Sequence, residues 1–260
     1  LVIGTKFGYD FYKNTSRRGQ EELPHNWQPE YIRFALEESL KRLGTTYVDL
    51  YQLHNPRIDA IQRDDIFATL EQLKAEGKIR AYGAALGPAI AERQIEEGKA
   101  AIEQRGVHVV QMIYNLLEQL LGLGVFETAR RHQSSILVRV PHASGLLDGT
   151  VKPETVFAED DHRHHRVSTD DKKKAWQIDG LKKVEQLKFL DASRTLGQTA
   201  IQFILAEPSM ASVLPNIYNE AFLKEFAAAP STPVIAPDEL SRIQALYAEN
   251  FGLQPAAASE

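Results

Sequence analysis

Short apolar runs alternate with longer segments of helical periodicity along this chain. Apolar residues spaced by three and four predict helices at about 29–43, 66–76, 89–105, 172–193, 196–206 and 237–250, one that ends near Arg131 and a short one from Asn219. Six apolar runs have the length of buried strands: 1–6, 47–53, 79–84, 108–113, 135–140 and 211–215. This repeated strand-then-helix order favours a parallel sheet covered by helices on both faces.

Two candidate catalytic residues stand where apolar runs end. Across Gly44 the apolar spacing changes from three and four to two, so a helix stops there and a strand follows that ends at His54. Lys6 ends the first run in the same way. In a barrel of alternating strands and helices, side chains at the carboxyl ends of the strands meet substrate. A cation there lowers the pKa of a nearby phenol, and an imidazole orients a carbonyl oxygen. A solvated lysine and a histidine that only satisfies a backbone group are the alternatives.

Two long loops interrupt the alternation, at 7–28 and 141–171. Loops of this length are often functional, so we expect them to govern substrate choice. Four aromatic residues of the first loop could form the floor of a substrate pocket, or they could only pack the loop onto the rim of the barrel: Tyr9, Phe11, Tyr12 and Trp27. The second loop carries His162, His164 and His165 beside Asp160 and Asp161, but their spacing fits no standard zinc motif. We therefore expect a solvated polar loop and no metal site.

Composition narrows the class of protein. A chain of 260 residues that is 43% hydrophobic can bury one full α/β barrel core, so we expect a single domain. The net charge of -5 and scattered basic residues give nucleic-acid binding little support. The absence of cysteine excludes disulfides and thiol chemistry. No apolar run reaches the roughly 18 residues that span a bilayer, and no signal segment is visible. These features predict a soluble, cytoplasmic protein with no membrane partner.

Several motifs carry a family resemblance. They are SLKRLGTTYVDLYQLH at 39–54, GTKFG at 4–8, EGKIRAYG at 76–83, YNLL at 114–117, SGLLDG at 144–149 and SVLP at 212–215. In this order, from residue 1 to about residue 250, they resemble the aldo-keto reductase family. The resemblance implies a TIM-type (β/α)8 barrel as a single domain, 1–260. The first strand matches the third of that family, so we expect two βα units, roughly 60 residues, to be absent before Leu1. Six of the eight strands are then visible.

The resemblance also implies an activity. Such enzymes reduce an aldehyde or ketone to an alcohol, or catalyse the reverse reaction, by hydride transfer with a nicotinamide cofactor. Lys6 and His54 match two members of the family's catalytic group of four. The other two, an aspartate and the proton-donating tyrosine, belong to the segment before Leu1 and match no residue here.

Further positions match residues that hold the cofactor in the family. Gln111 takes the place of the glutamine that binds the nicotinamide carboxamide, whereas Ala85 and Leu86 replace a serine-asparagine pair, which would leave backbone groups to compensate. Arg139 stands where the family has an aromatic residue that stacks on the nicotinamide ring, and a guanidinium can also stack there. The alternative role of Arg139 is an internal salt bridge. The loop that wraps the pyrophosphate matches Val140, Pro141, His142 and Ser144, and the segment at the adenosine end matches Leu214, Pro215, Asn216, Tyr218, Phe222, Glu225 and Phe226.

The choice of cofactor is less well determined by these matches. Family membership favours NADP(H). Tyr218 stands where a cation commonly meets the 2′-phosphate, and Phe222 and Phe226 can stack on adenine without supplying charge. NAD(H) therefore remains open.

Two other functions are compatible with the sequence. The departures from the family pattern suggest a catalytically inactive cofactor-sensing or interaction protein on the same scaffold as the main alternative. A barrel hydrolase or lyase is weaker, because no paired carboxylates or metal ligands are evident.

Overall fold

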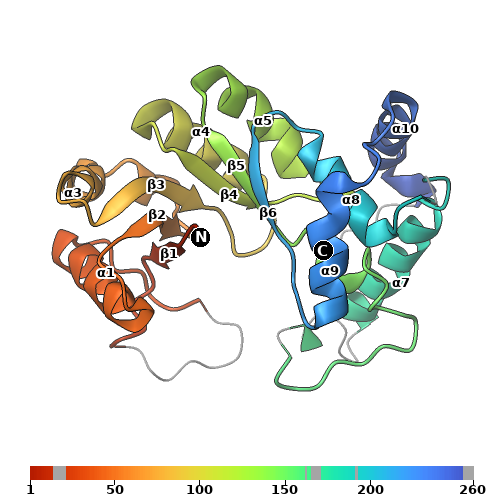
Figure 1. Ribbon diagram of the computed structural model, residues 1–260, viewed down its shortest axis with the longest axis horizontal. Coiled ribbons are helices and arrows are strands. Elements are labelled where there is room, and N and C mark those ends of the chain that lie inside the picture. The colour runs from red at the N-terminus through yellow and green to blue at the C-terminus, as the bar shows by residue number, and fades with distance from the viewer. Residues whose placement is uncertain (14–21, 162, 165–170, 191–192, 254–260) are drawn as a thin grey trace. The chain divides into compact units, whose positions relative to one another are not determined.

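The six predicted strands are all present. We describe the protein from a computed structural model that covers residues 1–13, 22–161, 163–164, 171–190 and 193–253. The strands are β1 (Gly4–Phe7), β2 (Val48–His54), β3 (Ile79–Ala85), β4 (Val109–Ile113), β5 (Ser135–Arg139) and β6 (Met210–Leu214). They follow chain order in one six-stranded sheet (Figure 1).

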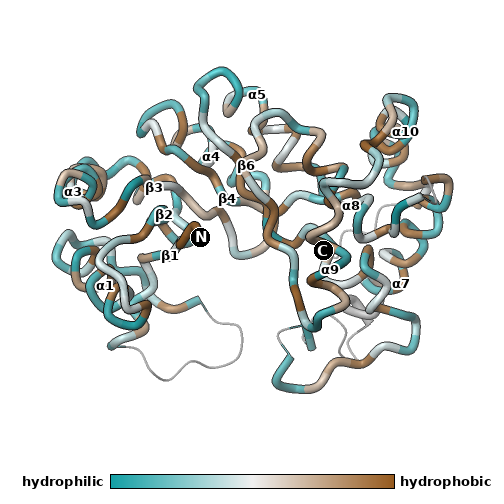
Figure 2. Tube along the Cα trace, in the orientation of Figure 1, coloured by the Kyte–Doolittle hydropathy of each residue, from teal (hydrophilic) through white to brown (hydrophobic). Residues whose placement is uncertain are grey.

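The helices lie where periodicity predicts them, with one short addition. They are α1 (Pro29–Leu43), α2 (Ile58–Ile61), α3 (Asp64–Ala75), α4 (Arg93–Arg105), α5 (Leu120–His132), α7 (Asp171–Glu185), α8 (Leu196–Leu205), α9 (Glu220–Ala228) and α10 (Pro237–Ala248), with 3₁₀ turns at Ala143–Gly145, Ala229–Ser231 and Asn250–Gly252. Along them hydrophilic and hydrophobic residues alternate, as in amphipathic helices (Figure 2). No helix in these described ranges is long and apolar enough to cross a membrane.

Three predicted boundaries are wrong. The first strand begins at Gly4, where pairing with β2 starts, and Leu1 and Val2 before it are exposed. The helix predicted from 89 begins at Arg93, since the side chain of Gln94 donates to the carbonyl oxygen of Ala89 at 2.6 Å and the preceding chain turns. The helix predicted to reach 193 ends at Glu185, where backbone hydrogen bonds shorten to a spacing of three residues.

The chain divides into two compact units, which we describe separately. The first comprises residues 1–113 and 121–137, and the second residues 114–120 and 138–260. The single-domain assignment of 1–260 stays a prediction.

In the first unit the strand register defines two faces of the sheet. β1 to β4 pair in parallel, with Lys6 opposite Gln52. The hydroxyl of Tyr51 donates to the carbonyl oxygen of Ile32 in α1 at 2.9 Å, so Tyr51 faces the helices. Side chains alternate along a strand, and Gln52 and His54 therefore lie on the opposite face. The face turned away from α1 carries the candidate catalytic residues.

Helix α1 ends as its sequence predicts. Gly44 adopts a left-handed conformation with φ 65°, and its N–H donates to the last carbonyl groups of the helix. A residue with a side chain is strained in this conformation, which explains why a glycine stops the helix there.

Gly83 in β3 permits a close approach to β4. A Cβ atom at this position would lie under 3.0 Å from the backbone oxygen of Val109. We expect Gly83→Ala to lower the free energy of unfolding by about 1–3 kcal/mol, the usual cost of overpacking. Urea unfolding measures the change. Gly4→Ala is the matched control, because its Cβ would lie 3.7 Å from Leu50, an ordinary contact. Equal stability of the two variants would contradict this account of β3.

Candidate active site

Lys6 and His54 lie on the same face of adjacent strands. Lys6 pairs in register with Gln52, and His54 follows Gln52 by two residues on that face. With strands about 4.8 Å apart and a rise of about 3.3 Å per residue, the two Cα atoms are about 8 Å apart. Both residues are half-buried. The ammonium and the imidazole therefore emerge at the same edge of the sheet, where the strands end.

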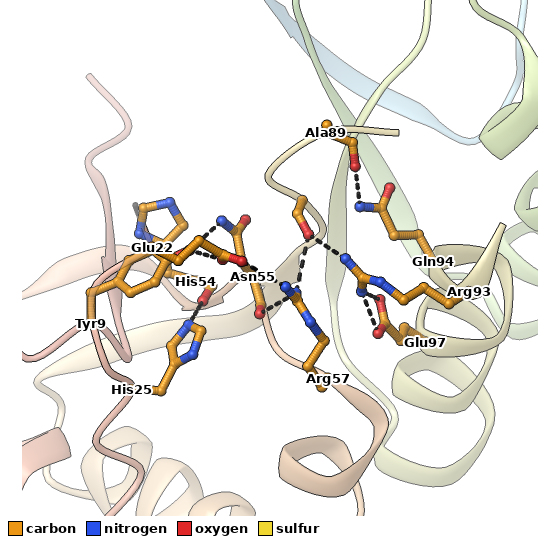
Figure 3. A network of polar contacts seen from close by, with 11 residues as sticks. Tyr9, Glu22, His25, His54, Asn55, Arg57, Ala89, Arg93, Gln94 and Glu97 are labelled. Atoms are coloured by element: carbon orange, nitrogen blue, oxygen red, sulfur yellow. Dashed lines mark hydrogen bonds and ion pairs between the residues drawn. The ribbon is translucent and has the colours of Figure 1, made fainter. Parts of the chain in front are cut away.

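Two aromatic side chains from the segment after β1, Tyr9 and His25, contact His54 (Figure 3). The ring of Tyr9 meets the His54 ring edge-on, with 4.8 Å between centroids and 70° between planes. Nε2 of His25 lies 3.0 Å from the carbonyl oxygen of His54, the distance of a donated hydrogen bond. The side chain and the backbone of His54 thus both contact this one segment.

Arg57 joins three loops at the strand ends. Its guanidinium donates to the carbonyl oxygens of Asn55 at 3.0 Å and Gly87 at 3.1 Å, and to the carboxylate of Glu22 at 2.8 Å. These partners follow β2, β3 and β1, respectively. Arg93 also donates to Gly87 at 3.1 Å. Sequence reasoning missed this role of Arg57, and the only signal was its position shortly after His54.

Burial and hydrogen bonding shift the pKa values of the rings beside His54. Burial, with the hydrogen bond to Glu22, raises the pKa of Tyr9 to about 12. Burial also lowers the pKa of His25. Both rings are consequently neutral at neutral pH, and the charged groups beside them are the carboxylate of Glu22 and the guanidinium of Arg57.

Gln111 faces the same side of the sheet as His54. The register aligns His54 with Ala85 and Ala85 with Gln111, which makes a row across β2, β3 and β4. Gln111 is 2% exposed, and its amide oxygen has no hydrogen-bond partner among the described residues. An unsatisfied buried acceptor is costly by about 1–3 kcal/mol, so a ligand that donates a hydrogen bond would stabilise it.

The serine-asparagine pair of the family has no structural substitute at Ala85 and Leu86. Both side chains are buried and apolar. The carbonyl oxygen of Ala85 accepts from the N–H of Asn55, and the N–H of Leu86 donates to the carbonyl oxygen of Gln111, each at 2.8 Å. These two backbone groups are already paired, so the compensation expected from the backbone does not come from them.

The second unit contains the residues from Arg139 onward. Arg139 ends β5 and is half-buried. In the following loop three residues have left-handed backbones, with φ of 59° at Val140, 47° at Ala143 and 58° at Ser144. The amide of Asn115 holds this loop by donating to the carbonyl oxygen of Val140 at 3.0 Å. Strained conformations of this kind gather at ligand-binding sites.

His142 and the residues of α9 converge on the start of α8. Nε2 of His142 lies 3.1 Å from the carbonyl oxygen of Gly197, and its ring packs on Phe226 at 4.2 Å. Burial lowers the pKa of this imidazole. Thr195, the N-cap of α8, donates its hydroxyl to Glu225. An open hollow of about 360 Å³ lies beside this start, lined among others by Asp148, Thr195, Gly197 and Glu225.

Tyr218 stands beside a cation that the sequence did not indicate. Tyr218 is 50% exposed and its hydroxyl accepts from Asn216 at 3.1 Å. The guanidinium of Arg163 lies 5.0 Å from the Tyr218 ring and 4.0 Å from the Phe157 ring. Arg163 also pairs with Asp161 at 2.7 Å. The other matched residues of this end, Leu214, Pro215 and Phe222, lie in or beside β6 and α9.

The histidine-rich loop shows no metal-binding group in the part that the structure describes. Nδ1 of His164 lies 2.7 Å from the carbonyl oxygen of Phe157, and Asp161 is engaged by Arg163. His162 and His165 lie outside the described residues. No group of three or more potential ligands was found among the described residues.

The strands follow chain order in the sheet, and polar side chains stand at the carboxyl ends of the strands, as in α/β barrels. Residues 1–248 match the model of the Aldo/keto reductase family, and the chain belongs to that family. Its fold is the α/β barrel of TIM type, with six strands in this chain.

Named relatives agree with this assignment. The chain is 27% identical over 225 residues to the aldo-keto reductase yakc of Schizosaccharomyces pombe, whose name specifies NADP(+), covering 86% of this chain and 63% of the relative. It is 30% identical over 161 residues to the NADH-specific methylglyoxal reductase of Escherichia coli, covering 60% and 48%, respectively. The holo structure of aldo-keto reductase AKR11C1 from Bacillus halodurans superposes with a TM-score of 0.72 at 27% identity, over 95% of this chain and 72% of that one. The chain thus spans about half to two thirds of the length of these curated relatives.

Proposed function

We propose that this protein is a nicotinamide-dependent oxidoreductase that reduces an aldehyde or ketone to an alcohol, or catalyses the reverse reaction. The observation that carries the proposal is the placement of Lys6 and His54 on one face at the ends of adjacent parallel strands, in a member of the aldo-keto reductase family. The roles of both residues rest on their match to the family motif.

His54 and Lys6 have different roles in the proposed reaction. The nicotinamide cofactor supplies the hydride. The imidazole of His54 orients the oxygen of the carbonyl substrate by a hydrogen bond. The ammonium of Lys6 favours the deprotonated form of a neighbouring acid, and so tunes the proton donor. The tyrosine that donates the proton in the family matches no residue of this chain.

Gln111 suits the nicotinamide carboxamide. Its buried amide oxygen lacks a partner among the described residues and lies in a row with His54. The amino group of a carboxamide can donate to such an oxygen. For the rest of the cofactor we propose Arg139 and the loop of Val140, Pro141, His142 and Ser144 at the pyrophosphate, and the 214–226 segment at the adenosine end. The left-handed backbone of that loop supports this assignment.

Oxidation of NADPH and NADH in the presence of a panel of aldehydes and ketones, followed by absorbance, tests the proposal. We expect turnover of at least one carbonyl compound by the 260-residue chain. Fluorescence titration with each cofactor separates binding from turnover. Binding without turnover of any carbonyl or alcohol would reject the enzyme and favour the cofactor-sensing alternative, which the apolar Ala85 and Leu86 motivate. No binding of either cofactor would reject both.

We propose further that the cofactor is NADP(H) and that Arg163 supplies the charge missing at Tyr218. The guanidinium lies over the ring that stands at the family's 2′-phosphate position. Its pair with Asp161 occupies Nε and one terminal nitrogen of a group with five N–H donors. We expect Arg163→Met to raise the Kd for NADPH about tenfold, since a hydrogen bond to a charged group contributes about 1.5–3 kcal/mol, and to leave the Kd for NADH unchanged.

The matched control is Arg242→Met. Arg242 also stacks on an aromatic ring, Phe189 at 3.8 Å, in the same unit. The Arg242→Met substitution should leave the Kd for NADPH and the Kd for NADH as in the wild type. Equal loss of NADPH and NADH binding in Arg163→Met would mean that Arg163 acts on the fold of its loop, and tighter binding of NADH than NADPH by the wild type would reject the NADP(H) assignment.

A further inference from the structure

The ring of Tyr9 contacts the imidazole of His54 in the first unit. The two rings meet edge to face at 4.8 Å and 70°, a favourable aromatic geometry. The contact joins residues that are far apart in sequence, one after β1 and one at the end of β2. His54 is half-buried, and the Tyr9 ring is one of the groups that touch it.

The Tyr9 ring is itself held from several directions. It stacks on His25 at 4.3 Å with 18° between planes, and His25 stacks on Trp27 at 4.8 Å with 14°. Its hydroxyl donates to Glu22 and accepts from the amide of Asn55 at 2.7 Å. A ring fixed on one face and at its hydroxyl has little freedom to rotate.

The backbone around Tyr9 is also tied down. Tyr9 and His25 form an antiparallel bridge, and the hydroxyl of Tyr31 in α1 donates to the carbonyl oxygen of Tyr9 at 2.7 Å. Gly8 has φ 131°, and a side chain there would collide with Trp27. These contacts hold the Tyr9 ring beside His54.

We propose that Tyr9 is a positioning residue that holds the imidazole of His54 in its reactive orientation. That the orientation is a reactive one rests on the proposed function. That Tyr9 contacts and orients the ring rests on the ring geometry alone. Tyr9 acts through its ring. Its hydroxyl is engaged by Glu22 and Asn55 and serves to fix that ring, not to donate a proton to substrate.

The raised pKa of about 12 agrees with this division of roles. A phenol that donates a proton near neutral pH works best when its pKa is lowered toward the pH of the reaction. Burial and the hydrogen bond to Glu22 shift Tyr9 in the opposite direction. Tyr9 is thus a poor substitute for the proton-donating tyrosine of the family.

Two substitutions separate the ring from the hydroxyl. Tyr9→Leu removes the ring, and we expect kcat for carbonyl reduction to fall by about tenfold to hundredfold, because small misplacements of a catalytic group are costly. The Kd of the cofactor should stay unchanged. Tyr9→Phe keeps the ring and should retain most of the wild-type kcat. A loss in Tyr9→Phe as large as in Tyr9→Leu would overturn the positioning role in favour of a chemical role of the hydroxyl.

A second readout does not depend on turnover. In NMR spectra of the chain, ring signals of His54 are identified among the 8 histidines by their disappearance in His54→Gln. We expect nuclear Overhauser effects between the rings of Tyr9 and His54, retained in Tyr9→Phe. In Tyr9→Leu the His54 ring signals should shift. Unchanged His54 signals in Tyr9→Leu would overturn the inference even if the enzyme is active, whereas a wild type without turnover would count against the proposed function alone.

Tyr47→Leu is the matched control for both readouts. Tyr47 immediately precedes the opposite end of the same strand, where its ring packs under Arg80 at 4.3 Å. The substitution is the same, but it lies far along β2 from His54. We expect wild-type kcat and unshifted His54 signals. If Tyr47→Leu shifts the His54 signals as much as Tyr9→Leu does, the effect is a general response of the strand and the inference fails.

Discussion

Replacing His54 by alanine is expected to lower kcat/KM for carbonyl reduction by about 10²–10⁴-fold, the range of a single general acid–base group. Lys6→Met should lower it comparably, since it removes the cation at the same edge of the sheet. The expected loss corresponds to about 3–5 kcal/mol of transition-state stabilisation. The Kd of the cofactor should stay unchanged in both variants. Steady-state kinetics together with fluorescence titration of NADPH measure the two quantities.

Exposed residues of the same types provide the controls. Lys41→Met removes a lysine whose side chain is 71% exposed in α1, and His132→Ala removes an exposed histidine in α5. Neither change should alter kcat/KM. Wild-type activity in both Lys6→Met and His54→Ala would refute the assigned roles. Loss of cofactor binding in both variants would instead place these residues in the binding step.

Glu239→Gln is expected to cause the largest loss of stability, about 3 kcal/mol. Glu239 pairs at 2.7 Å with Arg194, whose side chain is only 1% exposed. Removing one partner of a buried ion pair typically costs about 3–5 kcal/mol. The lower end applies because the glutamine carbonyl can still accept a hydrogen bond. Urea unfolding of the purified variant gives the change in free energy.

Glu220→Gln is the corresponding control. Glu220 also lies in the first turn of a helix and pairs at 2.7 Å with Lys224, but both side chains are more than three quarters exposed, at 77% and 76%. Exposed pairs contribute about 0–1 kcal/mol. We therefore expect little change. A loss in Glu220→Gln equal to that in Glu239→Gln would show that burial of Arg194 is not the cause.

The ion pair of Arg194 and Glu239 also illustrates how the burial of a side chain depends on segments that are distant in the sequence. Arg194 donates to the carbonyl oxygen of Pro233 at 3.1 Å and to the hydroxyl of Thr199 at 3.2 Å. Its surroundings come from α8, from α10 and from the chain between the Ala229–Ser231 turn and α10. Nothing in the local sequence near Arg194 distinguishes it from the exposed arginines, because its burial is created by segments about forty residues away.

The order of elements and the candidate catalytic residues were accessible from sequence for a local reason. Apolar spacing differs between helix and strand, and Gly44 marks the change between them. Lys6 and His54 stand at or next to the ends of the runs so defined. Boundaries failed where side chains compete with the backbone, as at Gln94, or where helical hydrogen bonds give way to turns after Glu185.

The sequence by itself determined the alternation of strands and helices and the positions at which strands end, because hydrophobic periodicity and turn residues act over a few neighbours. Only the tertiary structure decided which groups meet there. Three contacts join residues from separate elements: Tyr9 with His54, Arg57 with its three partners, and Arg163 with Tyr218. Such contacts depend on strand register and on how loops pack. The pattern of apolar and polar residues along the sequence does not specify the distances between residues of separate elements.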